Sequence, residues 1–389
     1  MKRTVYLDHN ASTPLDRRVL DIMCSALERY SANPSSIHSP GQEARLALER
    51  AREQTASLLN ARPDQIIFTG SGTESINIAI QGALLACDNK TQRHLIVSSI
   101  EHPAVRNTAL ACSEGGTDLD FLPVDSSGFV SCDQLEQLIT EHTRLVSVMC
   151  ANNETGAVQD LERISDVCRR RRIPFHTDAV QGFGKLDLSP EKTGFDLLSA
   201  SAHKIYGPKG VGLLYFRNRG LLFPLLRGGG QENGLRPGTE ALAGILGFVE
   251  ALRIMCEKKS EENARLSDFT SFLRREIKFR IPDVAFNTPE IRCLPGTLSI
   301  SVPLVDGESL LTELDMNGIC VSSGSACSSG DPQPSRVLKA MGLSDEKATG
   351  SLRLSLGRTT TKEELEFFLH ILTGAVSRLR RMHPLETPA

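Results

Sequence analysis

Two residues near the middle of the chain have types and positions that suit covalent catalysis. Lys204 follows a short apolar run, and a desolvated lysine has the lowered pKa that favours Schiff-base formation. Asp178 ends another apolar run, 26 residues earlier. Taken alone, each has an ordinary explanation, as a solvated lysine and as a turn-capping aspartate. Together they favour pyridoxal phosphate, which needs a lysine for its aldehyde and a carboxylate at its pyridinium nitrogen.

A glycine-rich turn is the candidate phosphate-binding segment. It comprises residues 70–73, Gly-Ser-Gly-Thr, and lies between an apolar run and a predicted helix at residues 74–86. The backbone N–H groups and the dipole at a helix N-terminus favour an anion. The spacing matches neither a dinucleotide fingerprint, since Ser75 stands where its third glycine is required, nor a P-loop.

Three more residues are candidates, each with a simpler alternative. His102 precedes a proline at a predicted helix start and could stack on a ring or transfer protons, although most isolated histidines are surface or capping residues. Cys327 lies in the Gly/Ser/Pro-rich segment 322–335, where a thiol can react or be an ordinary loop residue. Arg353 is a charge inside a predicted strand, where its planar guanidinium could bind a carboxylate or face solvent.

The elements that would position these residues alternate between helical patterns and short apolar runs from residue 16 to 260. This alternation predicts a doubly wound α/β domain with a largely parallel sheet and with ligands at the carboxyl ends of the strands. Polar residues follow five of the runs, so we expect their side chains to converge on one site. The predicted strands are 66–69, 95–99, 119–122, 145–149, 173–177, 196–199 and 212–216.

A smaller α+β domain is predicted from residues 1–15 and 261–389, including the segment 322–335. Its predicted elements are a charged helix at 261–279, strands at 298–302 and 351–356, and a short helix at 336–341. A last helix begins at Thr361, where Glu364 completes a capping-box pattern. No flexible linker separates the two predicted domains, so we expect firm contact between them.

Composition narrows the function classes. The 389 residues carry a formal net charge of -3, which offers no global attraction to nucleic acids. The ten cysteines include no C-x-x-C pair, so neither a zinc or other metal site nor a disulfide framework is predicted. The chain shows neither an apolar signal segment nor a membrane-spanning stretch, and a cytoplasmic protein is the expectation.

Ten motifs follow one another in order between residues 5 and 380. They are TPLDRRV, NPSSIH, FTGSGTESIN, EHPAV, NNETG, HTDAVQ, SAHKIYGPKG, GGGQENGLRPGTE, SSGSAC and LRLSLGR. This combination resembles the cysteine desulfurases of the NifS/IscS type, in the class V aminotransferase group. The resemblance implies a homodimeric transferase of fold type I that depends on pyridoxal 5′-phosphate. Its large domain would hold a mostly parallel sheet flanked by helices, with the smaller α+β domain beside it.

The resemblance also implies roles at the cofactor. Lys204 would bind the aldehyde, Asp178 would pair with the pyridinium nitrogen, and His102 would stack on the ring and assist proton transfer. The remaining implied cofactor contacts are Gln181 at the phenolic oxygen, Asn153, and a phosphate site of Gly72, Thr73, Ser201, His203 and Thr239, the last from the second subunit.

The substrate roles are implied in the same way. Arg353 would bind the carboxylate of L-cysteine, with Asn153 and Asn33 orienting the amino acid. Cys327 would attack the sulfur, keep it as a persulfide and leave L-alanine. A protein acceptor would then receive the sulfur, in an iron–sulfur scaffold, a tRNA-thiolation system or a DNA phosphorothioation system.

Two other functions remain open at this point. One is a selenocysteine lyase, or an aminotransferase of the same fold, which would not need Cys327. The other is a non-enzymatic scaffold in a sulfur-transfer complex. The presence of every chemical group named above argues against the scaffold.

Overall fold

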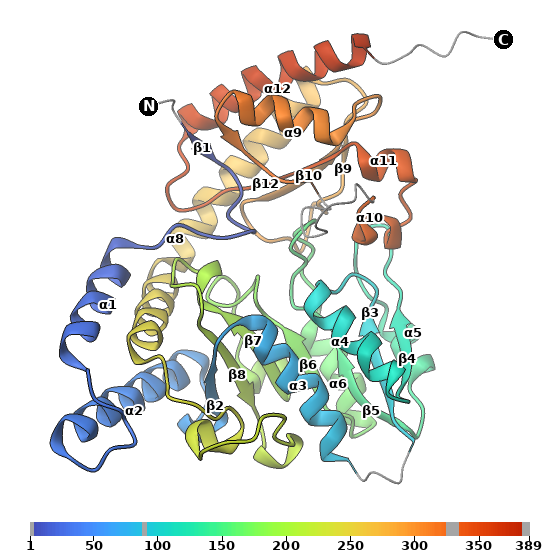
Figure 1. The fold of residues 1–389 in the computed structure, drawn as a ribbon. Helices are drawn as coiled ribbons and strands as arrows, with labels where there is room; N and C mark the ends of the chain where they lie inside the picture. Colours follow the sequence, from blue (N-terminus) through green and yellow to red (C-terminus); the bar gives the residue numbers. More distant parts are fainter. Residues whose placement is uncertain (1–3, 88–91, 324–333, 383–389) are drawn as a thin grey trace.

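A computed structural model describes residues 4–87, 92–323 and 334–382. The larger of its two bodies is built on a seven-stranded sheet with the order β2-β8-β7-β6-β5-β3-β4 (Figure 1). Only β8 runs antiparallel to its neighbours, which confirms the predicted α/β class with a mostly parallel sheet. The strands are β2 (Ile66–Thr69), β3 (His94–Ser98), β4 (Asp118–Leu122), β5 (Thr143–Ser147), β6 (Phe175–Asp178), β7 (Leu197–Ser201) and β8 (Gly212–Phe216).

Helices cover both faces of this sheet because its strands are apolar on both sides. Ile66 and Phe68 of β2 pack into one core with helices α2, α6 and α8, whereas Ile67 packs into a second core with α3 and α4. Successive residues of a strand point to opposite faces of the sheet, so a strand without polar residues must be covered on both faces. The helices are α1 (Arg17–Arg29), α2 (Ser39–Leu59), α3 (Gly72–Ala86), α4 (Pro103–Glu114), α5 (Cys132–Leu138), α6 (Leu161–Arg170), α7 (Pro190–Thr193) and α8 (Leu242–Arg280).

The smaller body has its own core. Its antiparallel sheet has the order β12-β10-β9, and the N-terminal β1 pairs in parallel with β11. Val5 and Leu7 join this core with apolar residues of β10, β12, α9, α12 and the second half of α8. The elements are β1 (Val5–Tyr6), β9 (Ala285–Phe286), β10 (Thr297–Ser301), β11 (Ile319–Cys320), β12 (Ser351–Ser355), α9 (Gly307–Met316), α10 (Arg336–Ala340), α11 (Asp345–Thr349) and α12 (Lys362–Met382).

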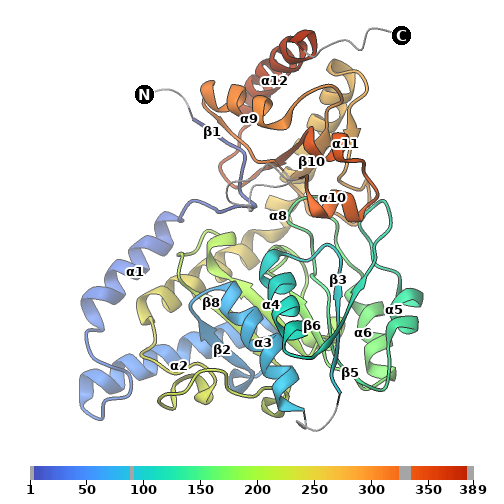
Figure 2. The same ribbon diagram turned by 45° about the vertical axis from the view of Figure 1, so that its right-hand side comes forward.

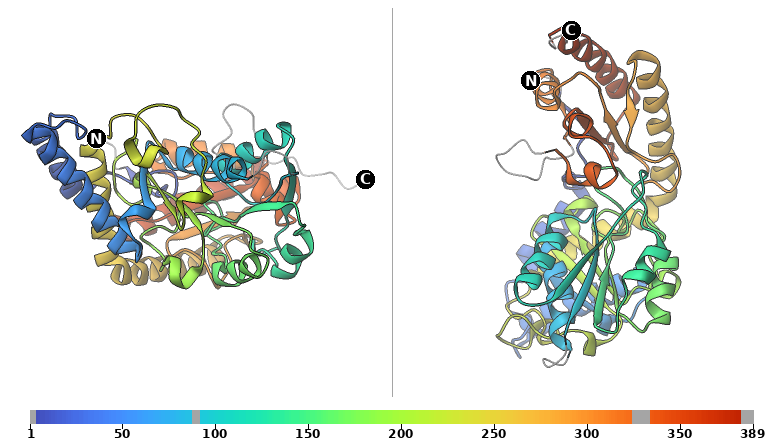
Figure 3. Two further views of the ribbon diagram at one scale, coloured as in Figure 1. Left: turned by 90° about the horizontal axis from the view of Figure 1, so that it is seen from below. Right: turned by 90° about the vertical axis from the view of Figure 1, so that its right-hand side faces the viewer.

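Helix α8 runs through both bodies without a break (Figure 3). Leu252 and Met255 lie in the core of the larger body, and Leu273 and Ile277 lie in the core of the smaller one. The boundary proposed at residue 260 therefore falls inside a single helix, and the division into two domains remains a prediction. A second contact comes from α10 and α11, whose Val337 and Ala348 pack against residues following β3 and β5 (Figure 2).

None of the helices within residues 4–87, 92–323 and 334–382 combines the length and the apolar character of a transmembrane span.

A buried ion pair ties α2 to the turn before α8. Arg52 donates to both carboxylate oxygens of Glu232, at 2.8 and 2.9 Å, and also to the Ile66 carbonyl at 2.7 Å. Glu232 in turn accepts from the Phe68 N–H at 2.9 Å. The pair therefore fixes β2, the strand that precedes the glycine-rich turn.

We expect Glu232→Gln to lower the free energy of unfolding by about 3 kcal/mol, because it leaves the buried Arg52 guanidinium with only the half-exposed Glu49 carboxylate, 3.8 Å away, as a counter-charge. Urea denaturation at fixed protein concentration, followed by circular dichroism, measures this loss. Asp64→Asn is the control, since Asp64 pairs with Arg62 on the surface and its loss should have a much smaller effect. Equal effects of the two substitutions would contradict the importance of the buried pair.

Candidate active site

A cavity of about 750 Å³ lies at the carboxyl ends of the parallel strands, between the two bodies. It brings together side chains from five strand ends, as the sequence led us to expect. The smaller body contributes Asp8, Ser322 and Arg353 to the same cavity. The predicted site residues that line it are Gly72, Thr73, His102, Asn153, Asp178, Gln181, Ser201, His203, Lys204 and Arg353.

Two predicted residues in the described chain do not line this cavity, and a third lies outside the described residues. Asn33 is exposed, and its Oδ1 accepts a hydrogen bond from the Ser35 N–H at 2.9 Å. Thr239 is also exposed and does not line the cavity. Cys327 lies in residues 324–333, outside the described part of the chain.

The N-terminus of α3 opens onto the cavity. Ser71 caps this 15-residue helix by accepting from the Glu74 N–H at 3.1 Å, so the helix begins at Gly72. A Cβ at residue 72 would lie 2.8 Å from Val180 Cγ2 and 3.3 Å from Ser201 Cβ. Only glycine lets the first turn of α3 approach these neighbours so closely, and this leaves the backbone N–H groups free to face an anion.

Asp178 ends β6 as a buried carboxylate. Its Oδ1 accepts from the Val180 N–H at 2.9 Å, which orients the carboxylate at the cavity wall. Burial raises the pKa of Asp178 to about 6, although Val180 and the nearby Lys204 act in the opposite direction. A group with a positive charge in the cavity would therefore stabilise the ionised form.

His102 caps α4 with its side chain. Nδ1 accepts from the Ala104 N–H at 3.1 Å, so the proton of the neutral ring is on Nε2. Burial, with a contribution from Lys204, lowers the pKa of His102 to about 4. The ring is consequently neutral near pH 7 and presents a single N–H donor.

Lys204 is held by residues that the sequence analysis did not identify. Nζ donates to the carbonyl oxygens of Asn10 and Ala11, at 2.6 and 2.7 Å. Gln181 Nε2 donates to the same Asn10 carbonyl at 2.9 Å. The N-terminal segment 8–12 thus forms one wall of the cavity, and the polar run Asp-His-Asn directly after an apolar strand was the available signal.

Arg353 is almost completely buried, with 4% of its side chain exposed. Nη2 pairs with Asp8 Oδ1 at 2.7 Å, and Nη1 donates to the Asn153 carbonyl at 3.3 Å. Nε is buried without a hydrogen-bond partner in the described structure. The guanidinium is therefore fixed in place while it keeps a donor for a further acceptor, such as a carboxylate.

Comparison with known proteins identifies the family. The profile of the aminotransferase class-V family matches residues 5–368. The chain is 44% identical to cysteine desulfurase IscS of Dictyoglomus turgidum, over 99% of this chain and 97% of that protein. This chain belongs to the cysteine desulfurases of the aminotransferase class-V family.

Solved structures agree with this cysteine desulfurase fold. A structure described as a NifS-like protein has a TM-score of 0.91 and 38% identity, and covers 97% of this chain and 100% of that one. A structure of SspA in complex with cysteine has a TM-score of 0.81 and 36% identity, and covers 91% of this chain and 99% of that one. The predicted family and fold class are confirmed.

Cysteine desulfurases use pyridoxal 5′-phosphate, and the cavity fits that cofactor. Lys204 supplies an amine and Asp178 supplies a buried carboxylate, while the N-terminus of α3 faces the same space as Ser201. Gln181 Oε1 is buried without a hydrogen-bond partner among the described residues. Because buried polar atoms are usually paired, this orphaned oxygen is typical of a wall that a bound group completes.

We expect Gly72→Ala to weaken the binding of pyridoxal phosphate to the apoprotein about tenfold, because the new methyl group overpacks against Val180. Titration of the apoprotein with the cofactor, followed by absorbance, gives the dissociation constant. Gly220→Ala is the control, since its nearest neighbour would lie at an ordinary 3.4 Å. Unchanged affinity in Gly72→Ala would show that the close approach at α3 is not needed.

Proposed function

We propose that this chain removes sulfur from L-cysteine, releases L-alanine and retains the sulfur on Cys327 as a persulfide. The observation that carries the proposal is one cavity that holds an amine, a buried carboxylate and a buried guanidinium, namely Lys204, Asp178 and Arg353. The similarity to cysteine desulfurases over 99% of the chain supports the same function. In the balanced reaction, the Cys327 thiol loses its proton and forms a sulfur–sulfur bond as the carbon–sulfur bond of L-cysteine breaks. The substrate carbon keeps the electron pair of the broken bond and gains a proton, so the carbon is reduced and the sulfur is oxidised to the persulfide.

Pyridoxal phosphate supplies, when bound, an electron sink for the substrate carbon. Lys204 would hold the aldehyde end, and the Asp178 carboxylate would hold the ring nitrogen in its protonated form. His102, neutral and with its proton on Nε2, would stack on the ring and exchange protons there. Gln181 and Asn153 would contact the ring substituents from the cavity wall.

The phosphate would lie at the N-terminus of α3. Gly72 and Thr73 provide the first backbone donors of that helix, and Ser201 and His203 follow β7 on the opposite side. In a homodimer, Thr239 of the partner subunit would complete this anion site.

Arg353 would bind the carboxylate of L-cysteine through the donors that Asp8 does not use. Asn153 lies beside it, since its carbonyl accepts from Arg353 Nη1. Asn33 would take part from the partner subunit, because it does not line the cavity of its own chain. The cysteine bound in the SspA structure supports this choice of substrate.

Cys327 would accept the sulfur and pass it to a protein. Ser322, five residues earlier in the sequence, lines the cavity and forms a β-bridge with Arg353. The acceptor would belong to an iron–sulfur scaffold, a tRNA-thiolation system or a DNA phosphorothioation system. Transfer assays with these candidate proteins distinguish among them.

We expect Cys327→Ala to bind pyridoxal phosphate normally but to lose both alanine formation and sulfur labelling. The substitution removes the thiol while leaving every cofactor contact intact. Incubation with ³⁵S-cysteine, followed by peptide mapping and alanine analysis, tests this. Cys24→Ser, which changes an exposed cysteine on α1, should behave like the unmodified protein. Continued alanine formation by Cys327→Ala would favour another lyase of this fold, such as a selenocysteine lyase.

The pKa of Asp178 predicts how cofactor affinity depends on pH. Above about pH 6 the carboxylate is ionised and can pair with a protonated ring nitrogen, whereas below pH 6 it becomes protonated and the pairing is lost. We therefore expect the affinity for pyridoxal phosphate to fall as pH decreases through 6. The folding stability of the apoprotein depends on pH in the opposite direction. Because the pKa of Asp178 is raised by folding, its ionisation lowers the stability of the folded apoprotein above pH 6, and this loss of stability disappears toward pH 4.

The measurement is a series of cofactor titrations between pH 5 and 8, in the unmodified protein and in Asp178→Asn. The phosphate of the cofactor also titrates near pH 6, and Asp178→Asn reports that contribution alone. The difference between the two profiles isolates Asp178. Parallel profiles would contradict its pairing with the ring nitrogen.

A further inference from the structure

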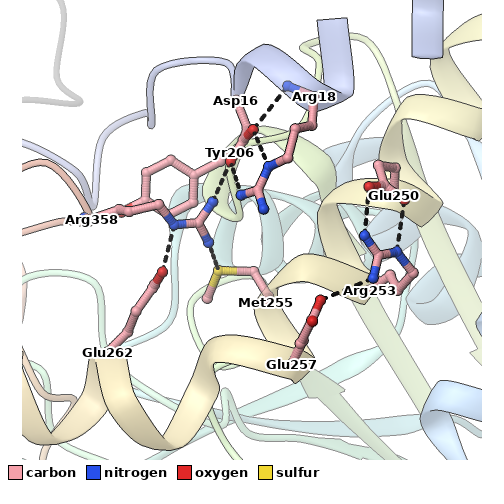
Figure 4. Close-up of polar contacts among 9 residues, drawn as sticks. All are labelled: Asp16, Arg18, Tyr206, Glu250, Arg253, Met255, Glu257, Glu262 and Arg358. Atoms are coloured by element: carbon pink, nitrogen blue, oxygen red, sulfur yellow. Dashed lines mark hydrogen bonds and ion pairs between the residues drawn. The ribbon is translucent and has the colours of Figure 1, made fainter. Parts of the chain in front are cut away.

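The loop after β12 reaches across the junction of the two bodies through Arg358 (Figure 4). Its Nη1 pairs with Asp16 Oδ2 at 2.6 Å, and its Nε pairs with Glu262 Oε1 at 2.5 Å. Asp16 caps α1, and Glu262 lies on α8. In the described chain, the start of α1 and helix α8 are the two segments that connect the larger body with the smaller one. One guanidinium therefore pairs with a carboxylate on each connecting segment.

The same arginine contacts Tyr206, two residues after Lys204. The Arg358 N–H donates to the Tyr206 hydroxyl at 2.6 Å, and the guanidinium lies 4.2 Å from the centre of the tyrosine ring. This is both a hydrogen bond and a cation–π contact, and both partners are largely buried. Figure 4 shows the ring alongside the Arg358 side chain, whose guanidinium reaches Asp16.

Tyr206 has a backbone conformation that tyrosine rarely adopts, with φ of 65°. Its N–H donates to Thr13 Oγ1 at 2.7 Å, and its carbonyl accepts from the Asp16 N–H at 3.0 Å. A strained residue persists only where its surroundings determine its position from several sides. The turn that follows Lys204 is therefore held in place by contacts from the N-terminal segment and from Arg358.

The loop that carries Arg358 is itself held from both sides. Arg265 of α8 donates to the carbonyls of Thr360 and Gly357, at 2.8 and 3.0 Å. On the other side the His9 ring is so close that a Cβ at Gly357 would lie 2.1 Å from its Cε1. The loop cannot shift without breaking these contacts, so it can transmit the position of β12 to Tyr206.

We propose that Arg358 and Tyr206 form a positioning unit that fixes Arg353 relative to Lys204. Arg353 and Arg358 are five residues apart, and the strand and loop between them belong to the smaller body. Lys204 and Tyr206 are two residues apart in the larger body. The contact between Arg358 and Tyr206 therefore sets the span between a carboxylate-binding group and the lysine that would hold the cofactor aldehyde. This inference rests on the roles that the proposed function gives to Lys204 and Arg353.

The span matters only for a ligand that engages both groups. L-alanine has an amine and a carboxylate, whereas ethylamine is the same molecule without the carboxylate. Misplacing one binding group relative to the other should therefore weaken L-alanine and leave ethylamine unchanged. General damage to the cofactor site would weaken both ligands.

The test uses the holoenzyme with Arg358→Lys, Tyr206→Phe and the double variant. Lysine keeps the charge but cannot bind two carboxylates and cover a ring at once. Phenylalanine keeps the ring but loses the acceptor for the Arg358 N–H. The matched control is Arg253→Lys, because Arg253 also binds two carboxylates, Glu250 and Glu257, but is 52% exposed and lies wholly on α8 (Figure 4).

Dissociation constants for L-alanine and ethylamine are measured from the change in cofactor absorbance, with KM and kcat for L-cysteine alongside. We expect Arg358→Lys to weaken L-alanine about tenfold and to raise KM for L-cysteine similarly, with ethylamine unchanged. Tyr206→Phe should act in the same direction, and the double variant should weaken L-alanine at least as much as Arg358→Lys, since lysine keeps the backbone N–H that donates to Tyr206 while phenylalanine keeps the ring beside the guanidinium. Arg253→Lys should match the unmodified protein.

Equal losses for L-alanine and ethylamine would overturn the positioning role, as would no loss for either. Failure of the proposed function is distinguishable, because the unmodified protein would then form no alanine from L-cysteine while the two binding measurements could still be made.

Discussion

The buried carboxylate of Asp178 is the constraint on which the arrangement of the cavity depends. It lies at the end of a strand that is covered on both faces, where water cannot solvate its charge. Ionisation is therefore costly unless a cation lies nearby, and the Val180 N–H offsets only part of that cost. Lys204 and a protonated cofactor ring would both supply positive charge, while His102 remains neutral and does not compete. The order of strands in the sheet thus determines the electrostatics of the site.

The smaller body supplies what the larger sheet lacks. The carboxyl ends of the sheet strands provide backbone N–H groups and short polar side chains, which suit a cofactor. A substrate carboxylate needs a guanidinium, which the smaller body places on the facing wall of the cavity. Arg353 comes from β12, and the N-terminal segment that continues from β1 carries the carbonyl oxygens that hold Lys204. Because β1 belongs to the small core, the lysine is positioned by both bodies. Contacts such as Arg358 with Tyr206 are needed to keep two separately packed cores in one geometry.

The sequence predicted the local elements closely and the long-range contacts poorly. β2 and β8 have the predicted bounds, because apolar runs bounded by polar turns leave little choice of register. β5 ends two residues earlier than expected. The Met149 N–H donates to the buried Glu101 carboxylate and not to a carbonyl oxygen of a neighbouring strand. α8 was recognised only in its charged half, because one helix passes through two cores and its apolar face changes partner. Asn10 and Ala11 could not be assigned, since they meet Lys204 across more than 190 residues.

The pair between Arg353 and Asp8 explains how a buried arginine can remain stable in the cavity before an anionic substrate binds. Burying a guanidinium without a counter-charge would cost much free energy. A guanidinium whose N–H donors were all hydrogen-bonded would have none left for a ligand. Asp8 takes only Nη2, and the Asn153 carbonyl takes Nη1 at the longer distance of 3.3 Å. A carboxylate that approaches the unpartnered Nε–H would therefore gain a charge-assisted bond, while Asp8 keeps the group in position. Selectivity for an amino acid would then follow from geometry, because its amine would have to reach the cofactor aldehyde that Lys204 would hold while its carboxylate reaches Arg353.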